Sequence, residues 1–105
     1  MLQPDLSVFC DQSILDERGA HGAPDLLVEI LSPATAYKDQ TEKLRLYEAA
    51  GVREYWIVNA EAEYVIVFRA AAPQAFAKPD YYGGDESIPS EVLGADVPWM
   101  AFHLE

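Results

Sequence analysis

Apolar residues in this chain recur with a period of two in several short runs and with a helical period in one longer run. Glycines, prolines and short polar stretches separate these runs. The pattern predicts, in order, a strand in Leu2–Cys10, a strand in Asp25–Leu31, a helix in Asp39–Ala50, strands in Glu54–Asn59 and Tyr64–Arg69, and a short strand within Gln74–Tyr82. We expect Ala70–Pro73 to be a connector and Ser87–Glu105 to wrap an edge of the sheet.

The run Asp25–Leu31 is almost continuously aliphatic, which is typical of a central strand covered on both faces. Alternate residues fall on opposite faces of a strand. One face is expected to carry Leu26, Val28 and Ile30, and the other Asp25, Leu27, Glu29 and Leu31. Glu29 therefore needs a partner, a metal or water.

A strand followed by a helix and a second strand predicts a right-handed crossover, with Glu54–Asn59 parallel to Asp25–Leu31. Gly51 is expected to end the helix as a left-handed residue. After the short turn that begins at Asn59, Tyr64–Arg69 is expected to return as an antiparallel partner. The predicted class is α/β, a mixed sheet with one crossover helix.

The helix places a lysine on its apolar side. With Lys43 set at zero on a helical wheel, Tyr47 lies at about +40° and Leu46 at about −60°. Leu44 and Ala50 complete the predicted apolar face, so Lys43 is expected near its centre. A buried ammonium is costly unless an acid compensates it. The alternative is that the Lys43 stem passes Tyr47 and its ammonium reaches water.

Strand pairing is expected to bring a second carboxylate close to Glu29. If Leu2–Cys10 pairs antiparallel with Asp25–Leu31, Asp5 lies beside Glu29. Asp25 lies about 13 Å from Glu29 along the strand, at ~3.3 Å per residue, and belongs to the other end of the pair.

Two carboxylates beside a lysine suit metal-assisted hydrolysis of a phosphodiester. Carboxylate oxygens bind Mg²⁺ or Mn²⁺, and the bound ion polarises the phosphoryl group. The predicted site is Asp5, Glu29 and Lys43, with Asp5 and Glu29 as metal ligands. The possible accessory residues are Asp25, Asp39 and Tyr47. Several of these residues also have an ordinary structural interpretation: Asp5 as a strand-start residue after proline, Glu29 as an edge acid reaching solvent, Asp39 as a helix cap and Tyr47 as core.

Composition limits the choice of function. The chain has 105 residues, 50% of them hydrophobic, which suits one small globular domain. Its net charge is −11 with only seven Lys and Arg residues, so strong general binding to nucleic acid is not expected. One cysteine and two distant histidines give no zinc spacing. No run approaches the ~20 apolar residues of a membrane span and no signal peptide is visible, so we expect a cytoplasmic protein without membrane contact.

Several segments of this sequence, taken together, resemble the bacterial Uma-two family of restriction-endonuclease-like proteins. That family is similar to the PD-(D/E)XK nuclease superfamily. The resemblance rests on Pro4-Asp5, PDLLVEILSPAT, Asp39, Glu42-Lys43, Tyr47, Gly51-Val52 and EYWIVN. It implies a restriction-endonuclease-like core and Mg²⁺-dependent DNA cleavage. Asp5 would be the motif aspartate and Glu29 the motif acid. Leu31 stands where the motif lysine is expected, so Lys43 would supply that lysine from the helix.

The chain departs from the family at its start, because members usually carry a long segment before the Pro-Asp pair. We therefore expect residues 1–105 to form a single, partial restriction-endonuclease-like domain that lacks the N-terminal part of the fold. Its open sheet edge would be covered, for example in a homo-oligomer. The alternative to a nuclease is a non-catalytic interaction or assembly domain. A small-molecule hydrolase is disfavoured, since the chain has no G-x-S-x-G motif and no plausible Cys–His pair.

Overall fold

The computed structural model describes residues 6–8, 10, 15–16, 19–20, 22–31, 38–59 and 61–98, of which 15–16, 19–20 and 38–40 are described by their backbone. The elements are the strands β1 (Leu6–Val8), β2 (Leu15–Asp16), β3 (Gly19–Ala20) and β4 (Leu26–Leu31), the helix α1 (Lys38–Ala50), and the strands β5 (Glu54–Asn59), β6 (Tyr64–Ala72), β7 (Ala75–Phe76), β8 (Asp80–Gly83), β9 (Ser87–Ser90) and β10 (Ala95–Pro98).

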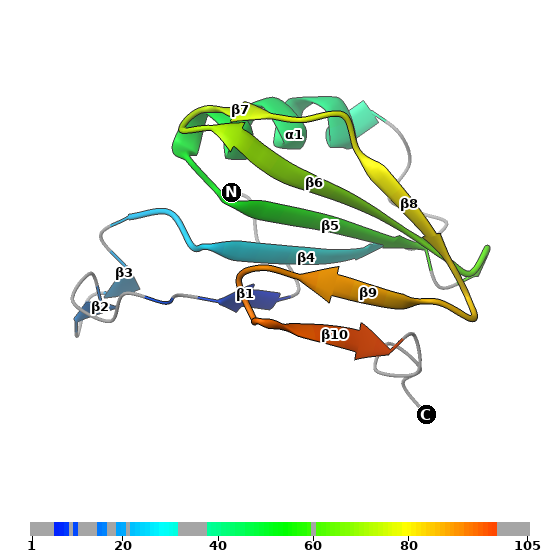
Figure 1. The fold of residues 1–105 in the computed structure, drawn as a ribbon. Coiled ribbons are helices and arrows are strands. Elements are labelled where there is room, and N and C mark those ends of the chain that lie inside the picture. Colours follow the sequence, from blue (N-terminus) through cyan, green and yellow to red (C-terminus); the bar gives the residue numbers. More distant parts are fainter. Residues whose placement is uncertain are drawn as a thin grey trace.

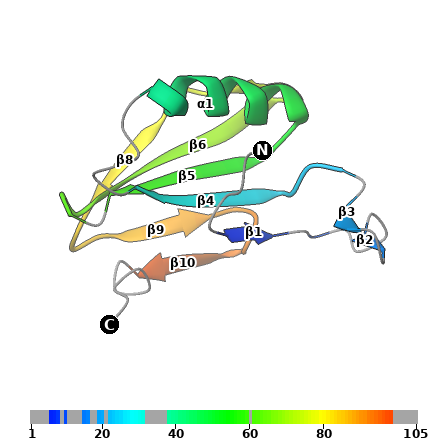
Figure 2. The same cartoon turned by 180° about the vertical axis from the view of Figure 1, so that it is seen from behind.

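The main sheet has six strands and is mixed, as predicted. Its order is β1-β4-β5-β6-β7, and β8 also pairs with β6. The pairing of β4 with β5 is parallel, and β1–β4 and β5–β6 are antiparallel. Helix α1 lies along one face of this sheet, and the β9–β10 hairpin lies on the other side (Figures 1 and 2).

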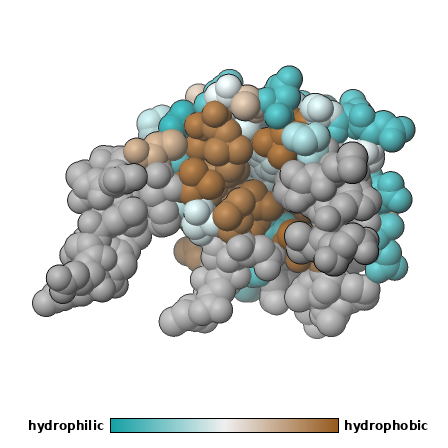
Figure 3. All heavy atoms as spheres, turned by 90° about the horizontal axis from the view of Figure 1, so that it is seen from below, coloured by the Kyte–Doolittle hydropathy of each residue, from teal (hydrophilic) through white to brown (hydrophobic). Residues whose placement is uncertain are grey.

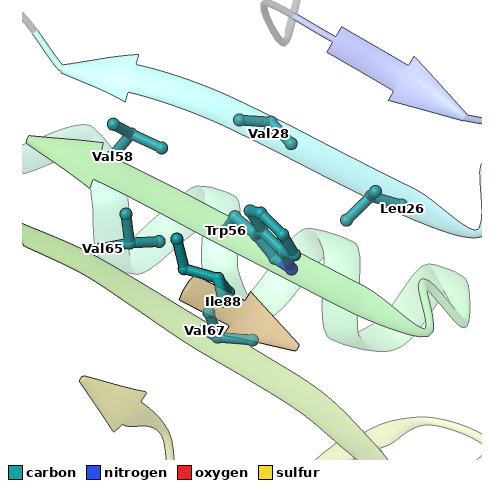
Figure 4. Packing of buried hydrophobic residues seen from close by; sticks show 7 residues of the cluster. All are labelled: Leu26, Val28, Trp56, Val58, Val65, Val67 and Ile88. Atoms are coloured by element: carbon teal, nitrogen blue, oxygen red, sulfur yellow. The ribbon is translucent and has the colours of Figure 1, made fainter. Parts of the chain in front are cut away.

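Strand β4 is covered on both faces, as its aliphatic sequence indicated. Leu26 and Val28 belong to a buried cluster with residues of β5 and β6, and Ile88 of β9 completes it (Figure 4). Leu27 belongs to a second cluster on the helix side. The members of that second cluster are Leu27, Tyr47, Val52, Tyr55 and Ile57. The sheet is therefore the middle layer of three.

The helix packs through a narrower face than the wheel predicted. Tyr47 is buried and Lys43 and Leu44 are partly buried, but Leu46 is 53% exposed and Ala50 is exposed. The buried arc is centred near Tyr47, so Leu46, about 100° away from it, faces solvent. The expectation for Leu46 and Ala50 was wrong, whereas the inward position of Lys43 is confirmed.

The C-terminal part differs most from the expected pattern. Strand β6 continues to Ala72 instead of ending at Arg69, and the segment Gln74–Tyr82 contains β7 and most of β8. Residues 87–98 form a hairpin that inserts Ile88, with no exposed surface, into the core. Ser87–Glu105 was expected to wrap an edge of the sheet. For residues 87–98 this expectation was wrong, because they form a hairpin that lies on a face of the sheet. Figure 3 looks onto this side of the molecule, where apolar residues gather near the middle.

Candidate active site

Glu29 is a buried carboxylate on the helix-facing side of β4, with only 5% of its surface exposed. Three side chains donate to it. Lys43 Nζ lies 3.0 Å and Tyr47 Oη 3.5 Å from Oε1, and Tyr55 Oη lies 2.5 Å from Oε2. The acid is thus solvated by side chains of the protein.

Two elements bring these donors together. In the parallel β4–β5 ladder, Leu27 pairs with Tyr55 and Glu29 pairs with Ile57, so Tyr55 and Glu29 lie two residues apart on neighbouring strands. Residues four apart in a helix share a face, so α1 presents Lys43 and Tyr47 side by side. The strand acid and the helix lysine meet because α1 packs over the middle of the sheet.

The Lys43–Glu29 contact is a partly buried ion pair. The lysine side chain is 24% exposed and the glutamate side chain 7%. The Lys43 ammonium therefore binds Glu29. This excludes the alternative in which the ammonium passes Tyr47 and contacts only water. An ammonium and a carboxylate this close compensate each other's loss of hydration.

The two tyrosines remain protonated at neutral pH. Burial, followed by the negative charge of Glu29 and the hydrogen bond to it, raises the pKa of Tyr47 from 10.0 to about 12. Burial raises the pKa of Tyr55 well above its usual range, and the hydrogen bond to Glu29 adds to this effect. Both hydroxyl groups therefore keep the proton with which they can donate to the carboxylate.

The ring of Tyr55 is held on two sides by other aromatic rings. It meets Tyr47 edge-on at 4.9 Å between ring centroids and stacks against Phe68 at 6.1 Å. Tyr55 has no exposed surface. Such packing leaves the ring little freedom to turn.

Asp25 lies apart from this cluster. Its carboxylate accepts hydrogen bonds from the Cys10 backbone N–H at 2.7 Å and from Arg53 at 3.3 Å. It stands just before β4, at the opposite end from Glu29, as the strand spacing predicted. Asp25 therefore joins the start of β4 to neighbouring segments and is not an accessory of the Glu29 site.

The side chains of two predicted site residues lie outside the described part of the chain. Asp5 lies outside the described residues, and Asp39 is described only by its backbone in α1. The antiparallel pairing that the prediction for Asp5 assumed is confirmed for β1, in which Leu6 pairs with Val28.

The sequence analysis missed two buried polar side chains. Tyr55 lies in the run Glu54–Asn59, for which only a strand was predicted, although alignment of the two parallel strands would have placed it near Glu29. Glu54 is 2% exposed and lies on the opposite face, where it accepts hydrogen bonds from Trp56 Nε1, Ser90 Oγ and the N–H groups of Glu91 and Val92. These donors come from β5 and from the β9–β10 hairpin, so Glu54 anchors the hairpin on the face of the sheet opposite the candidate site.

The cluster fits one ligand of a divalent cation. Oxygen atoms of carboxylates are the ligands that Mg²⁺ and Mn²⁺ prefer, and the Lys43 ammonium shows that Glu29 Oε1 already attracts a cation. Within residues 6–98, as far as they are described, no three His, Cys, Asp or Glu side chains gather as a metal site would need. Any further metal ligands must therefore come from groups other than the described side chains.

The described part of the chain contains no helix long and apolar enough to cross a membrane.

The fold is similar to a solved structure, that of "a putative nuclease belonging to DUF820" from Anabaena variabilis ATCC 29413, with a TM-score of 0.72 at 24% sequence identity. The match covers 93% of this chain and 57% of that one, so the present chain spans little more than half of the solved protein's length. No curated protein gives a significant match. The likeness confirms the predicted mixed α/β, nuclease-like fold.

Sequence comparison gives the family directly. Residues 1–99 match the family model of Uma2, whose description is "Putative restriction endonuclease". This match extends over almost the whole chain and includes β4, α1 and β5, which build the Glu29 cluster. The chain belongs to the Uma2 family.

Proposed function

We propose that this protein is a metal-dependent endonuclease that hydrolyses phosphodiester bonds in DNA, with Glu29 and Lys43 at its catalytic centre. The observation that carries the proposal is the ion pair between these residues, 3.0 Å long and set into an apolar layer between sheet and helix. Burying charged groups is costly, so an acid and a lysine paired in such a layer mark a candidate functional site. The family match and the nuclease-like fold support this choice of reaction.

In the proposed site, Glu29 Oε1 and a carboxylate oxygen of Asp5 would hold Mg²⁺ or Mn²⁺. When bound, the ion polarises the phosphoryl group and lowers the pKa of a coordinated water. The Lys43 ammonium, which has three donor hydrogens, orients the attacking water and stabilises negative charge on the phosphate oxygens. Tyr47 stands beside Lys43 and keeps its proton, so it serves as a neutral donor next to the acid.

The net charge of −11 opposes binding of the protein to DNA. A phosphate backbone is repelled by such a chain unless cations lie between them. A divalent ion at Glu29 would supply that positive charge locally. We therefore expect substrate binding to depend on the metal.

A non-catalytic interaction domain is the second candidate, and two observations favour it. Glu29 is already satisfied by Lys43, Tyr47 and Tyr55, so the cluster could serve only to fix α1 on the sheet. The net charge also suits a domain that avoids DNA. An interaction domain should be indifferent to Mg²⁺ and Mn²⁺.

Cleavage of supercoiled plasmid DNA tests the proposal. With Mg²⁺ or Mn²⁺ the wild type should nick or linearise the plasmid, and a chelator should stop it. Lys43→Ala and Glu29→Gln should each lower the rate by about 100-fold or more, as expected for loss of a group that stabilises the transition state. Arg45→Ala, which removes an exposed cation two residues along the same helix, should cleave like the wild type.

Folding must be checked in parallel, because Lys43→Ala breaks a partly buried pair. We expect it to lower the free energy of unfolding by about 1–3 kcal/mol, so the variant must be assayed where circular dichroism shows it to be folded. A wild type that never cleaves with either metal, or a folded Lys43→Ala protein that cleaves normally, would refute the nuclease proposal.

A further inference from the structure

The two oxygens of Glu29 are held in different ways. Oε2 accepts a short bond of 2.5 Å from Tyr55, a residue with no exposed surface. Oε1 accepts from Lys43 at 3.0 Å and from Tyr47 at 3.5 Å, and both of these donors come from α1. A contact of 3.5 Å is at the limit of hydrogen bonding, so part of the acceptor capacity of Oε1 is scarcely used.

The donor to Oε2 is also the most deeply buried of the three. Tyr55 belongs to β5, which is hydrogen-bonded to β4 along its whole length. Tyr47 and Phe68 pack against its ring. Lys43, in contrast, is a long side chain that is 24% exposed. One oxygen is thus fixed to the sheet, and the other faces Lys43, whose long side chain can adjust.

We propose that Tyr55 is a positioning residue of the metal site: its hydroxyl holds Glu29 Oε2 and so turns Oε1 toward the cation and Lys43. This inference rests on the proposed function, and adds to it the oxygen that binds and the residue that selects it. Groups that hydrogen-bond to a ligating carboxylate fix its orientation, and their loss typically costs 10- to 100-fold in metal affinity. Tyr55 touches neither metal nor substrate in this arrangement and acts only through Glu29.

The experiment is titration of the metal-free protein with Mn²⁺, followed by calorimetry or by the electron paramagnetic resonance of free Mn²⁺. Tyr55→Phe removes the hydroxyl and keeps the ring that contacts Tyr47 and Phe68. We expect it to weaken Mn²⁺ binding about tenfold or more, with the helix content unchanged. Tyr47→Phe, which removes the long contact to Oε1, should weaken binding much less. Tyr82→Phe, on the other face beside Arg69, is the matched control and should bind like the wild type.

The outcomes separate this inference from the function on which it rests. Mn²⁺ binding by the wild type that is lost in Glu29→Gln, but unchanged in Tyr55→Phe, overturns the role of Tyr55 and leaves the metal site standing. Equal losses in Tyr55→Phe and Tyr47→Phe overturn the assignment of the two oxygens. A wild type that does not bind Mn²⁺ overturns both proposals.

A crystal structure of the wild type with Mn²⁺ provides a measurement that does not depend on the folding of any variant. The inference expects the ion on Oε1 of Glu29 while Tyr55 Oη remains bonded to Oε2. An ion on Oε2, with Tyr55 displaced, would refute it.

Discussion

A carboxylate inside a β-strand loses most of its water, and Glu29 replaces that water with an ammonium and two phenols. The replacement explains how an acid can stand in a strand that is otherwise aliphatic. It also ties the ionisation of the two tyrosines to the acid, because a phenolate beside Glu29 would place two negative charges together in a buried layer.

This coupling predicts a loss of stability in alkali. The unfolded chain releases tyrosine protons near pH 10, whereas folded Tyr47 keeps its proton until about pH 12. Above pH 10 the unfolded state therefore binds fewer protons than the folded state, so stability falls as the pH rises from about 10 to 12. Tyr47 alone should account for a loss of about 2–3 kcal/mol, since one pKa unit is worth about 1.4 kcal/mol.

Urea denaturation at several pH values measures this effect, and ultraviolet absorbance of the phenolate follows the titration itself. Tyr47→Phe should lose less stability than the wild type over the same range. An equal loss in both proteins would show that Tyr47 is not responsible.

At the scale of elements, the β9–β10 hairpin is attached to the sheet by one buried acid. Glu54 begins β5 and accepts N–H groups of Glu91 and Val92 at 2.7 and 2.9 Å, as well as the Ser90 hydroxyl at 2.9 Å. A carboxylate that binds successive backbone N–H groups fixes the turn that carries them. Ile88 then fills the core from the same hairpin.

We predict that Glu54→Ala detaches this hairpin. It leaves several buried donors without an acceptor and should cost about 3 kcal/mol or more in the free energy of unfolding. Hydrogen exchange should show the Glu91 and Val92 amides losing protection before those of β4 and β5. Glu61→Ala, at an exposed turn position, is the control and should change stability by less than about 0.5 kcal/mol. Unchanged protection of the turn in Glu54→Ala would contradict the assignment.

At the scale of the molecule, the sheet has an edge strand that is only three residues long. Among the strands that the structure describes, β1 pairs only with β4, and its first residue, Leu6, is 51% exposed. Unpaired strand edges invite association with another chain. We propose that a second copy of the chain covers this edge in a homo-oligomer.

Sedimentation velocity over a range of concentrations tests the proposal. The wild type should show a mass above the 11.7 kDa of one chain. Leu6→Lys should shift the equilibrium toward the monomer, because it places a charge in the proposed interface. Leu46→Lys is a matched control, since Leu46 is 53% exposed but lies on α1. A wild type that stays monomeric, or equal effects of both substitutions, would reject this interface.

Much of the fold followed from periodicity. The aliphatic run of β4, the helical run of α1 and the β-branched run of β5 fixed the parallel pair and the helix between them, and the inward position of Lys43 followed from the wheel. Short strands with few residues, such as β7 and β9, carry too little period-two signal to be recognised. Leu46 was misplaced because the width of a buried helix face depends on how closely the sheet approaches.

The candidate site could be predicted in part. The meeting of Glu29 and Lys43 followed from one acid in an apolar strand and one lysine on an apolar helix face. The contribution of Tyr55 could not be recognised in the same way, since a tyrosine in a strand has an ordinary place in the core and only the register of β4 against β5 sets it beside Glu29. The buried role of Glu54 depended on a turn nearly 40 residues later in the chain.

The acid of the proposed centre belongs to the sheet, and its cationic partner belongs to a separate helix. Local opening that lifts α1 away would leave a native sheet with its carboxylate and no amine. Activity should then disappear at a lower temperature than the sheet itself melts, so inactivation would report on helix docking before it reports on global unfolding.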